Sequence, residues 1–518
     1  MEETSKQISE TKSANINDQE KPDIAIHDGK CQAKVSSLSF DPENWSAFRS
    51  LAYNMVDQSI SFIQQIRHRP VYSDVPIPQD VSDSINEPLP EKPQGLEKVC
   101  EDFTKLILPY SGGNVHPRFW GWAAGNGTPG TVIAHLMTAT MNSNAVGGAQ
   151  SSTLVEHQVL NWCRQIFNFP DTSSALIVTG TSMATIVALT VARNHAVGNN
   201  RDVRLNGIIG GPRLVGYASS ETHFCVSKAF ELLGLGRSAL RLIPTDPNYC
   251  INLDQLEKAI SEDLKLGNVP FCVIGNAGTV NTGSIDDLIA LKEFAMKYKL
   301  WFHVDGAFGA LAILDSEMKP RLNGIEHADS LAFDFHKWLH VPFDAGCLLI
   351  RNRILQLETF SSNHSYLTAR DISEDDHSYY KFGLELSRGF RALDIWFTLK
   401  EHGIQRLGQK IHENCQQAQY LVSLLSHYSW IRINTPVTLN IVCFRLEPDN
   451  LVDEKNIDEL NYNVVSDIQQ SGIAVPSTAT LNGRLYIRCC FINHRTVDED
   501  FNLFVNELIQ TTQKHLSL

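Results

Sequence analysis

Between residues 128 and 390, short apolar runs alternate with amphipathic stretches, and this alternation constrains the fold more than any other feature of the sequence. Strands buried on both faces read as continuous apolar runs, and the helices that cover them lie between the runs. The pattern therefore predicts an α/β domain with a mostly parallel central sheet. We expect helices over 183–194, 221–233 and 286–298. We expect strands over 175–179, 215–218, 240–243, 271–274, 300–304, 330–335 and 347–350.

The segment before this domain has two helical patterns that lack a core of their own. One begins near Trp45 and the other near Leu96, with a proline-rich stretch over 70–93 that predicts an extended connector. Such helices must pack on another domain or on a second subunit. The first apolar stripe consists of Trp45, Phe48, Ala52, Val56, Ile60 and Ile63, at three- and four-residue steps.

The two ends of the chain differ in character. Residues 1–36 are polar and poor in large apolar side chains, so we expect a disordered tail. Beyond residue 390 we expect one long helix and then strands, which indicates a small C-terminal α+β domain. The predicted parts are a tail (1–36), an N-terminal helical dimerisation segment (37–127), a large cofactor domain (128–393) and a small domain (394–518).

Composition excludes several classes of protein. A formal net charge of −14 argues against a nucleic-acid partner, because phosphate binding needs a basic face. The sequence has neither the apolar core of a signal peptide nor a run long enough to span a bilayer, so we expect no membrane partner. The 11 cysteines lack metal-binding spacing and suit a reducing compartment. A cytoplasmic protein without a bound metal is expected.

One carboxylate stands where an α/β sheet binds its ligand. Asp305 ends the apolar run 300–304, and ligands lie beyond the carboxyl ends of parallel strands. A carboxylate there can keep the ring nitrogen of a cofactor protonated, and the small Ala307 lets a flat ring lie against the strand. Taken alone, Asp305 could equally be a helix cap or a member of an ordinary ion pair.

A lysine follows the next predicted strand. Lys337 comes after the run 330–335 and lies between His336 and Trp338. Desolvation lowers the pKa of a lysine and makes its amine a nucleophile. The alternative is an ordinary surface lysine.

Two further features complete a series. The turn at Thr181 and Ser182, after the run 175–179, could hold a phosphate on free helix amides, or could be a plain helix cap. His223 could stack on a ring or be structural. Each signal is weak alone, but their order along the chain is the one that a single phosphorylated ring cofactor requires.

The sequence resembles the group II pyridoxal-phosphate-dependent amino-acid decarboxylases, most of all the aromatic-L-amino-acid decarboxylase branch. The resemblance runs from Phe48 to about Arg495 and includes His116-Pro-Arg-Phe, His303-Val-Asp, His336-Lys-Trp-Leu and Arg388-Gly-Phe-Arg-Ala-Leu. It implies the aspartate-aminotransferase-like fold (fold type I), pyridoxal 5'-phosphate as cofactor, and a homodimer. It also implies a lyase that converts an L-amino acid, in this branch an aromatic one, to the amine and CO2.

The resemblance assigns cofactor residues position by position. Lys337 matches the lysine that holds the cofactor covalently, and Asp305 matches the partner of its ring nitrogen. His223 matches the stacking histidine, which also lies near the departing carboxylate. The remaining matches are Ala307 behind the ring, Thr181, Ser182 and His336 at the phosphate, and Thr279 beside the cofactor.

Further matches concern the substrate. Tyr366 matches a tyrosine of a mobile loop that supplies a proton after CO2 has left, and His116 lies at the pocket entrance. Trp122 and Ala123 replace the aromatic residues that line the side-chain pocket of the aromatic branch. Ser387 stands at a position that tunes substrate choice, and Arg488 matches an arginine of the small domain near the site.

Departures from the family pattern leave the substrate open. Asp334-Phe335 stands where the family often has Asn-Pro, which places an extra carboxylate near the phosphate. Aromatic, histidine-like and other side chains remain candidate substrates. An aldehyde-forming oxidase would tend to lack the tyrosine at 366, and a non-catalytic binding protein would be expected to lose Lys337 or Asp305. Aminotransferase or other lyase chemistry is the remaining alternative.

Overall fold

The computed structural model describes residues 39–72, 77–198, 201–361 and 378–517. The chain divides into two compact units, 1–53 and 54–518, and helix α1 (Trp45–Gln64) crosses that boundary. The predicted apolar stripe therefore does form a helix. The predicted disordered tail lies outside the described residues.

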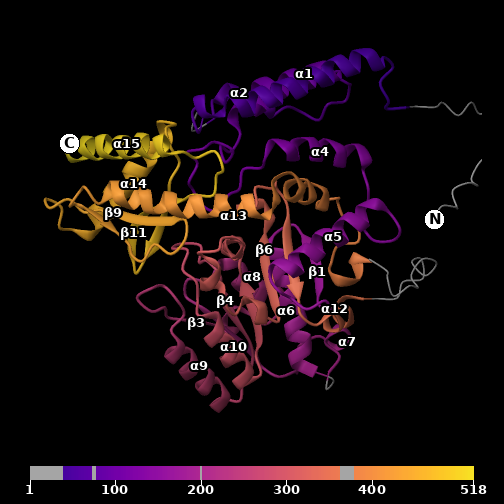
Figure 1. Cartoon of the computed structure of the whole chain (residues 1–518), viewed down its shortest axis with the longest axis vertical. Helices are drawn as coiled ribbons and strands as arrows, with labels where there is room; N and C mark the ends of the chain where they lie inside the picture. The colour runs from indigo at the N-terminus through magenta and orange to yellow at the C-terminus, as the bar shows by residue number, and fades with distance from the viewer. Residues whose placement is uncertain (1–38, 73–76, 199–200, 362–377, 518) are drawn as a thin grey trace, which may run out of the picture. The chain divides into compact units, whose positions relative to one another are not determined.

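A seven-stranded sheet is the centre of the larger unit (Figure 1). Its strand order is β1-β7-β6-β5-β4-β2-β3, and only β7 runs antiparallel to its neighbours. All seven predicted runs form strands. All are buried along most of their length except the run 240–243, which lies at the edge of the sheet and exposes Leu242. The strands are β1 (Ser174–Val178), β2 (Leu214–Ser219), β3 (Leu240–Ile243), β4 (Val269–Asn276), β5 (Trp301–Asp305), β6 (Ser330–Asp334) and β7 (Gly346–Ile350).

Helix α6 (Thr181–Val197) packs against this sheet and begins directly after β1. Most of the buried residues of α6 are small or branched apolar residues, and they lie on most sides of the helix. This pattern is typical of a buried helix. Its first turn therefore lies at the carboxyl end of β1. The other helices of this region are α5 (Ser151–Ile166), α7 (Val203–Asn206), α8 (Phe224–Leu232), α9 (Leu253–Lys265), α10 (Leu288–Tyr298), α11 (Phe335–Trp338) and α12 (Arg353–Phe360).

A four-stranded antiparallel sheet follows, with the order β10-β11-β9-β8. It has its own core, in which Phe444 and Ile487 meet Phe501 and Phe504 of the last helix. Figure 1 shows α14 and α15 beside β9 and β11, with α13 leading to them. The elements are α13 (Ala392–Leu425), β8 (Ile431–Ile433), β9 (Ile441–Leu446), α14 (Glu454–Gln470), β10 (Ser477–Leu481), β11 (Arg484–Cys490) and α15 (Asp498–Leu516).

The proline-rich stretch contains a helix, so the prediction of an extended connector was wrong in part. Helix α2 (Gln79–Ile85) forms there because its seven residues contain no proline, and the prolines only flank it. Helix α3 (Leu96–Asp102) and helix α4 (Pro129–Met141) follow. No helix of the described residues is both long and apolar enough to cross a membrane.

Candidate active site

The carboxyl ends of the parallel strands open into a cavity of about 480 Å³. The turn after β1 contributes Gly180 to it, and β4 and β5 contribute Asn276 and Asp305 at their last residues. Helix α11, directly after β6, contributes the lysine. Nine predicted site residues line this cavity: Trp122, Ala123, Thr181, Ser182, His223, Asp305, Ala307, His336 and Lys337.

Lys337 has a partner that the sequence did not predict. Its Nζ lies 2.9 Å from Oδ2 of Asp334, three residues earlier in the chain. Burial lowers the pKa of Lys337, but the Asp334 carboxylate outweighs burial, so the net direction is upward. The structure therefore contradicts the expectation of a lowered lysine pKa.

Asp334 points into the site, which resolves the question that its position raised. Its Oδ1 accepts a hydrogen bond from the backbone amide of Thr181 at 2.7 Å, and its Oδ2 lies 3.6 Å from Nε2 of His336. The carboxylate is almost completely buried. Asp334 therefore joins Lys337 to the first turn of α6.

The turn before α6 has the features of a phosphate site. Oγ1 of Thr181 is buried and makes no hydrogen bond to any described residue. The amides of a first helical turn have no partner within the helix, and they attract anions. A Cβ on Gly346 would lie 2.5 Å from Cα of Gly180, so β7 can approach the turn this closely only through glycine. An unpaired hydroxyl and a helix start thus face the cavity together.

Asp305 is a buried carboxylate whose charge is only partly compensated. Its Oδ1 accepts the amide of Ala307 at 3.1 Å, and Oδ2 lies 4.0 Å from Sγ of Cys225. Burial raises the pKa of Asp305, and the charge of Lys337 opposes that rise. A cation beside the carboxylate, such as a protonated ring nitrogen, would lower the pKa of Asp305 towards its ordinary value.

His223 caps helix α8 and faces the cavity as a neutral ring. Its Nδ1 accepts the amide of Cys225 at 3.3 Å, which leaves the proton on Nε2. Burial lowers the pKa of this imidazole, and the nearby Asp305 acts in the opposite direction. A flat, neutral imidazole is a suitable surface for a cofactor ring.

Thr279 and Ser387 do not line the cavity. Thr279 uses its hydroxyl within its own turn, 2.8 Å from Oγ1 of Thr282, and also accepts the amide of Ser284. Its neighbours Gly278 and Val280 line the cavity instead. Ser387 is exposed. Their roles stay predictions, and Tyr366 lies outside the described residues.

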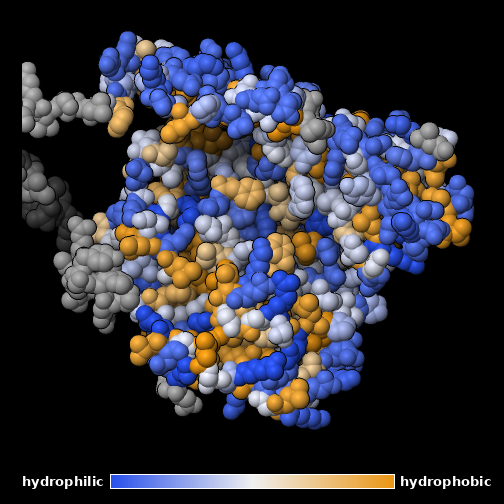
Figure 2. Space-filling model, turned by 180° about the vertical axis from the view of Figure 1, so that it is seen from behind, coloured by the Kyte–Doolittle hydropathy of each residue, from blue (hydrophilic) through white to orange (hydrophobic). Residues whose placement is uncertain are grey.

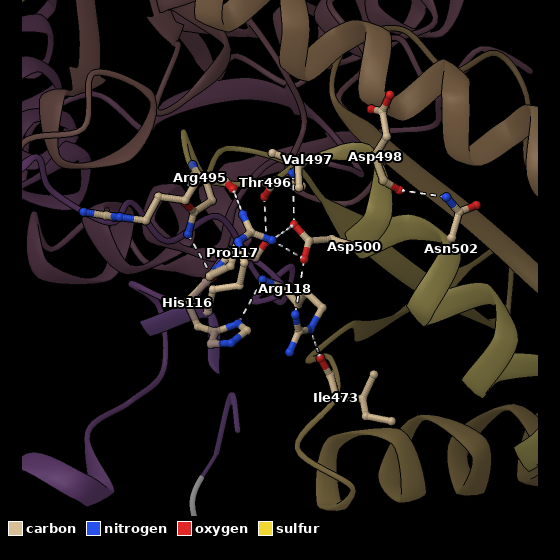
Figure 3. Close-up of polar contacts among 12 residues, drawn as sticks. His116, Pro117, Arg118, Ile473, Arg495, Thr496, Val497, Asp498, Asp500 and Asn502 are labelled. Carbon is tan, nitrogen blue, oxygen red and sulfur yellow. Dashed lines mark hydrogen bonds and ion pairs between the residues drawn. The ribbon is translucent and has the colours of Figure 1, made fainter. Parts of the chain in front are cut away.

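His116 lies in a network that joins distant parts of the chain (Figure 3). Its Nδ1 accepts the amide of Arg118 at 3.0 Å, and Nε2 lies 3.1 Å from the carbonyl oxygen of Arg69. The guanidinium of Arg118 reaches Asp500 in the first turn of α15 at 3.2 Å. Burial lowers the pKa of His116 to about 4. His116 does not line the cavity. Its contacts give it a structural role, and its role in substrate binding stays a prediction.

Arg488 connects the small sheet to the cavity wall. Its Nη1 donates to the carbonyl oxygen of Trp122 at 2.8 Å and its Nε to that of Val280 at 3.0 Å, and both of those residues line the cavity. The side chain is buried, and Nη2 makes no hydrogen bond to a described residue. The Nη2 group of Arg488 is therefore left without a hydrogen-bond partner among the described residues.

The lining residues that sequence reasoning did not select include Asn276, Cys225, Phe308 and Phe343. Asn276 pairs with Asp305 across β4 and β5, so its place at a strand end was the signal that could have found it. Cys225 lies in the first turn of α8, two residues after His223. No pattern places Phe308 or Phe343, because they come from irregular segments.

The residues present fit pyridoxal phosphate. Lys337 offers an amine, Asp305 a buried carboxylate for the ring nitrogen, and Thr181 an unpaired hydroxyl for the phosphate. Among the described residues, no three His, Cys, Asp or Glu side chains are placed to hold a metal ion.

Comparison with known proteins gives the same result. Residues 78–447 match the pyridoxal-dependent decarboxylase conserved domain. The chain is 33% identical to an aromatic-L-amino-acid decarboxylase of Bacillus atrophaeus, over 87% of this chain and 92% of that one. It is 29% identical to a phenylacetaldehyde synthase of Petunia hybrida, over 88% and 91%.

A solved structure is similar over nearly the whole chain. It is the Catharanthus roseus tryptophan decarboxylase in complex with L-tryptophan, with a TM-score of 0.82 and 25% identity, covering 92% of this chain and 100% of that one. Together with the cavity, these similarities establish the fold type I architecture and the cofactor. The chain belongs to the pyridoxal-dependent decarboxylase family and is a pyridoxal-phosphate-dependent amino-acid carboxy-lyase.

Proposed function

We propose that this enzyme removes the carboxylate of an aromatic L-amino acid and releases the amine. The observation that carries the proposal is the mixed character of the cavity. Lys337 and Asp305 occupy its floor, whereas Trp122, Phe308 and Phe343 give it apolar walls. Apolar walls suit a large side chain of low polarity. The relatives named above as decarboxylases support the same substrate class.

Each residue has a task that its surroundings support. Pyridoxal phosphate, when bound, supplies the sink for the electron pair that departing CO2 leaves behind. Lys337 would hold the cofactor through its amine, and Asp305 would keep the proton on the ring nitrogen. The Thr181 hydroxyl and the α6 amides would bind the phosphate, and His223 would cover the ring.

Arg488 is proposed to hold the substrate carboxylate. Its Nη1 and Nε are committed to the backbone carbonyls of two lining residues, and Nη2 has no hydrogen bond to a described residue. A guanidinium suits a carboxylate better than a lysine amine does, because it presents a fixed fork of donors. Arg488→Lys should therefore raise KM more than it lowers kcat.

Tyr366 decides between two outcomes of the reaction. A phenol beside the reacting carbon can deliver a proton after CO2 leaves and so yield the amine. The second candidate is oxidative formation of an aldehyde, since the Petunia relative is named an aldehyde synthase. The tyrosine at 366 favours the amine.

The test is a panel of L-amino acids incubated with the cofactor-loaded enzyme. We expect CO2 and amine in equal amounts from tryptophan, tyrosine or phenylalanine, and none from glutamate. Aldehyde and peroxide in place of amine would support the second candidate. Turnover of glutamate in preference to the aromatic substrates would contradict the proposed substrate class.

We also propose a homodimer. Helix α4 exposes Ile133, Leu136, Met137 and Met141, and exposed apolar residues on one helix typically mark an interface. Figure 2 shows that apolar patches, in orange, reach the surface between polar ones on the face drawn there. A second copy of the chain is the proposed partner for α4.

Two organisational proposals complete the description. The four parts 1–36, 37–127, 128–393 and 394–518 are supported by the sheets, since β1 to β7 lie within 174–350 and β8 to β11 within 431–490. A cytoplasmic location is supported by the cysteines of the described residues, which are all free thiols.

A further inference from the structure

A second cavity, of about 450 Å³, shares no lining residue with the cofactor site. It lies where the start of α4, the loop after α11, the segment after β11 and helix α13 meet. We call it the basic cavity, after five of its lining residues: His340, His402, Arg406, Lys410 and His494. The reaction described above uses none of them.

Helix α13 supplies two cations on successive turns. Gly403 breaks its helical conformation, and Arg406 and Lys410 follow on the face that lines the cavity. Arg406 makes no ion pair with any described residue. Lys410 pairs at 2.9 Å with Glu413, the one carboxylate among the lining residues. The lining therefore keeps an excess of positive charge.

Three buried polar atoms of this lining lack partners. Thr128 Oγ1, His340 Nε2 and His402 Nε2 make no hydrogen bond to a described residue. His340 is only 2% exposed, and its other nitrogen is bonded to Asn126 at 3.1 Å. Nε2 of His402 lies 3.7 Å from the carboxylate of Glu401, beyond hydrogen-bond distance. Buried polar groups are normally paired, so three unpaired atoms at one cavity point to a bound partner.

The charges around the histidines indicate whether the bound partner is an anion or a cation. Burial lowers the pKa of His340, and His494, Lys410 and Arg495 lower it further. Burial and Arg495 likewise lower the pKa of His494 to about 4. Neighbouring positive charge disfavours a cation and favours an anion. In the part of the chain that the structure describes, no three His, Cys, Asp or Glu side chains are grouped so that they could hold a metal ion.

We propose that the basic cavity binds a small oxyanion of the phosphate type, contacted by Arg406, Lys410 and Thr128. A phosphate group accepts hydrogen bonds at several oxygens, which suits a guanidinium, an ammonium and the unpaired Thr128 hydroxyl. The volume also leaves room for a small molecule that carries such a group.

The probe is inorganic phosphate, titrated calorimetrically into cofactor-saturated enzyme at pH 7 and constant ionic strength. Saturation with cofactor keeps the phosphate site at α6 filled. We expect saturable binding, competition by sulfate, and at least a tenfold loss of affinity in R406Q and in the double variant R406Q/K410Q. R237Q is the matched control, because Arg237 is also exposed but pairs with Glu231 elsewhere. It should bind phosphate as the wild type does.

Absence of phosphate binding by the wild type would overturn the proposal, and so would unchanged affinity in R406Q/K410Q. Thr128→Val tests the buried hydroxyl and should also weaken binding. Because that variant alters a buried position, R406Q and K410Q carry the test if it does not fold. All variants should keep the absorbance of the bound cofactor, which separates this site from the first.

Discussion

At the scale of single residues, Asp334 connects the groups that a cofactor would bind. Its carboxylate binds both the Lys337 ammonium and the Thr181 amide, which are the groups that a cofactor needs. A phosphate dianion arriving at α6 meets that negative charge. Asp334 therefore opposes the charge that the phosphate would bring.

Asp334→Asn should tighten cofactor binding, because the amide keeps the shape and removes the charge. Two charges a few ångströms apart near a protein surface interact by about 1–4 kcal/mol, which corresponds to about tenfold or more in affinity. Fluorescence titration of the apoenzyme with pyridoxal phosphate measures the change. Asp344→Asn is the control, since that carboxylate pairs with Arg391 at 2.7 Å. Equal or weaker binding in the Asp334 variant would contradict the argument.

Lys337→Ala should abolish the absorbance band of covalently held cofactor and nearly all turnover. Without the amine there is no covalent attachment, and substrate cannot exchange with it. Absorbance spectra and borohydride reduction followed by peptide mapping provide the measurement. Recovery of the reduced adduct on another lysine would refute the assignment.

Sequence alone could identify the main chemical groups but not their partners. Asp305, His223 and Lys337 follow predicted strands, and strand ends of a parallel sheet converge. The direction of the Asp334 side chain could not be predicted, because it depends on β7 bringing Gly346 beside Gly180. Thr279 was selected by resemblance, and its hydroxyl is used by a turn that no pattern predicts.

At the scale of elements, the strands were predictable and the connectors were not. Most of the seven runs are covered on both faces and are therefore apolar, which made them stand out in the sequence. Helix α2 was missed because the surrounding prolines suggested an extended chain, although none falls within its seven residues. Short helices of this kind depend on tertiary contacts more than on their own sequence.

Tyr366 leads to a prediction about the product of the reaction. Tyr366→Phe keeps the bulk of the ring and removes the acidic proton, so the carbon that lost CO2 stays unprotonated longer and reacts with oxygen. The variant should still release CO2 but shift product from amine towards aldehyde, with peroxide and ammonia. The amine-to-aldehyde ratio under air, compared with that of the wild type, measures the shift. An unchanged ratio at the wild-type rate would remove Tyr366 from the mechanism.

At the scale of the whole molecule, the exposed apolar face of α4 leads to a prediction about assembly. The full-length protein should sediment as a dimer, and deletion of residues 1–36 should leave the dimer intact. Replacement of Ile133 and Met137 by glutamate should dissociate it, because charged groups cannot be buried unpaired at an interface. Glutamate at Leu205, an exposed residue on α7, is the control. A folded, active wild-type monomer would contradict the proposal.

Buried histidines predict how stability depends on pH. The pKa values of His116, His303 and His494 lie at about 4 in the folded protein, against 6.5 in an unfolded chain. Their contribution to stability is complete above pH 6.5 and is lost as the pH falls towards 4, since only the unfolded chain takes up protons in that window. The loss is on the order of 3 kcal/mol for each histidine.

The thermal midpoint should therefore fall steeply between pH 6.5 and pH 4.5. His303→Gln should flatten this dependence, whatever its effect on the midpoint at pH 7. His427→Gln replaces an exposed histidine and should leave the slope unchanged. An identical slope in all three proteins would show that His303 does not titrate differently on unfolding.

The antiparallel strand β7 has a consequence for biosynthesis. It lies between β1, which leads into the phosphate turn, and β6, which leads into Lys337. β1 and β6 have no direct hydrogen bonds with each other, so residues 346–350 must insert before the two halves of the site can meet. A nascent chain still on the ribosome cannot assemble the site until β7 has left the exit tunnel. Vitamin B6 loading is thereby restricted to chains that have completed their large sheet.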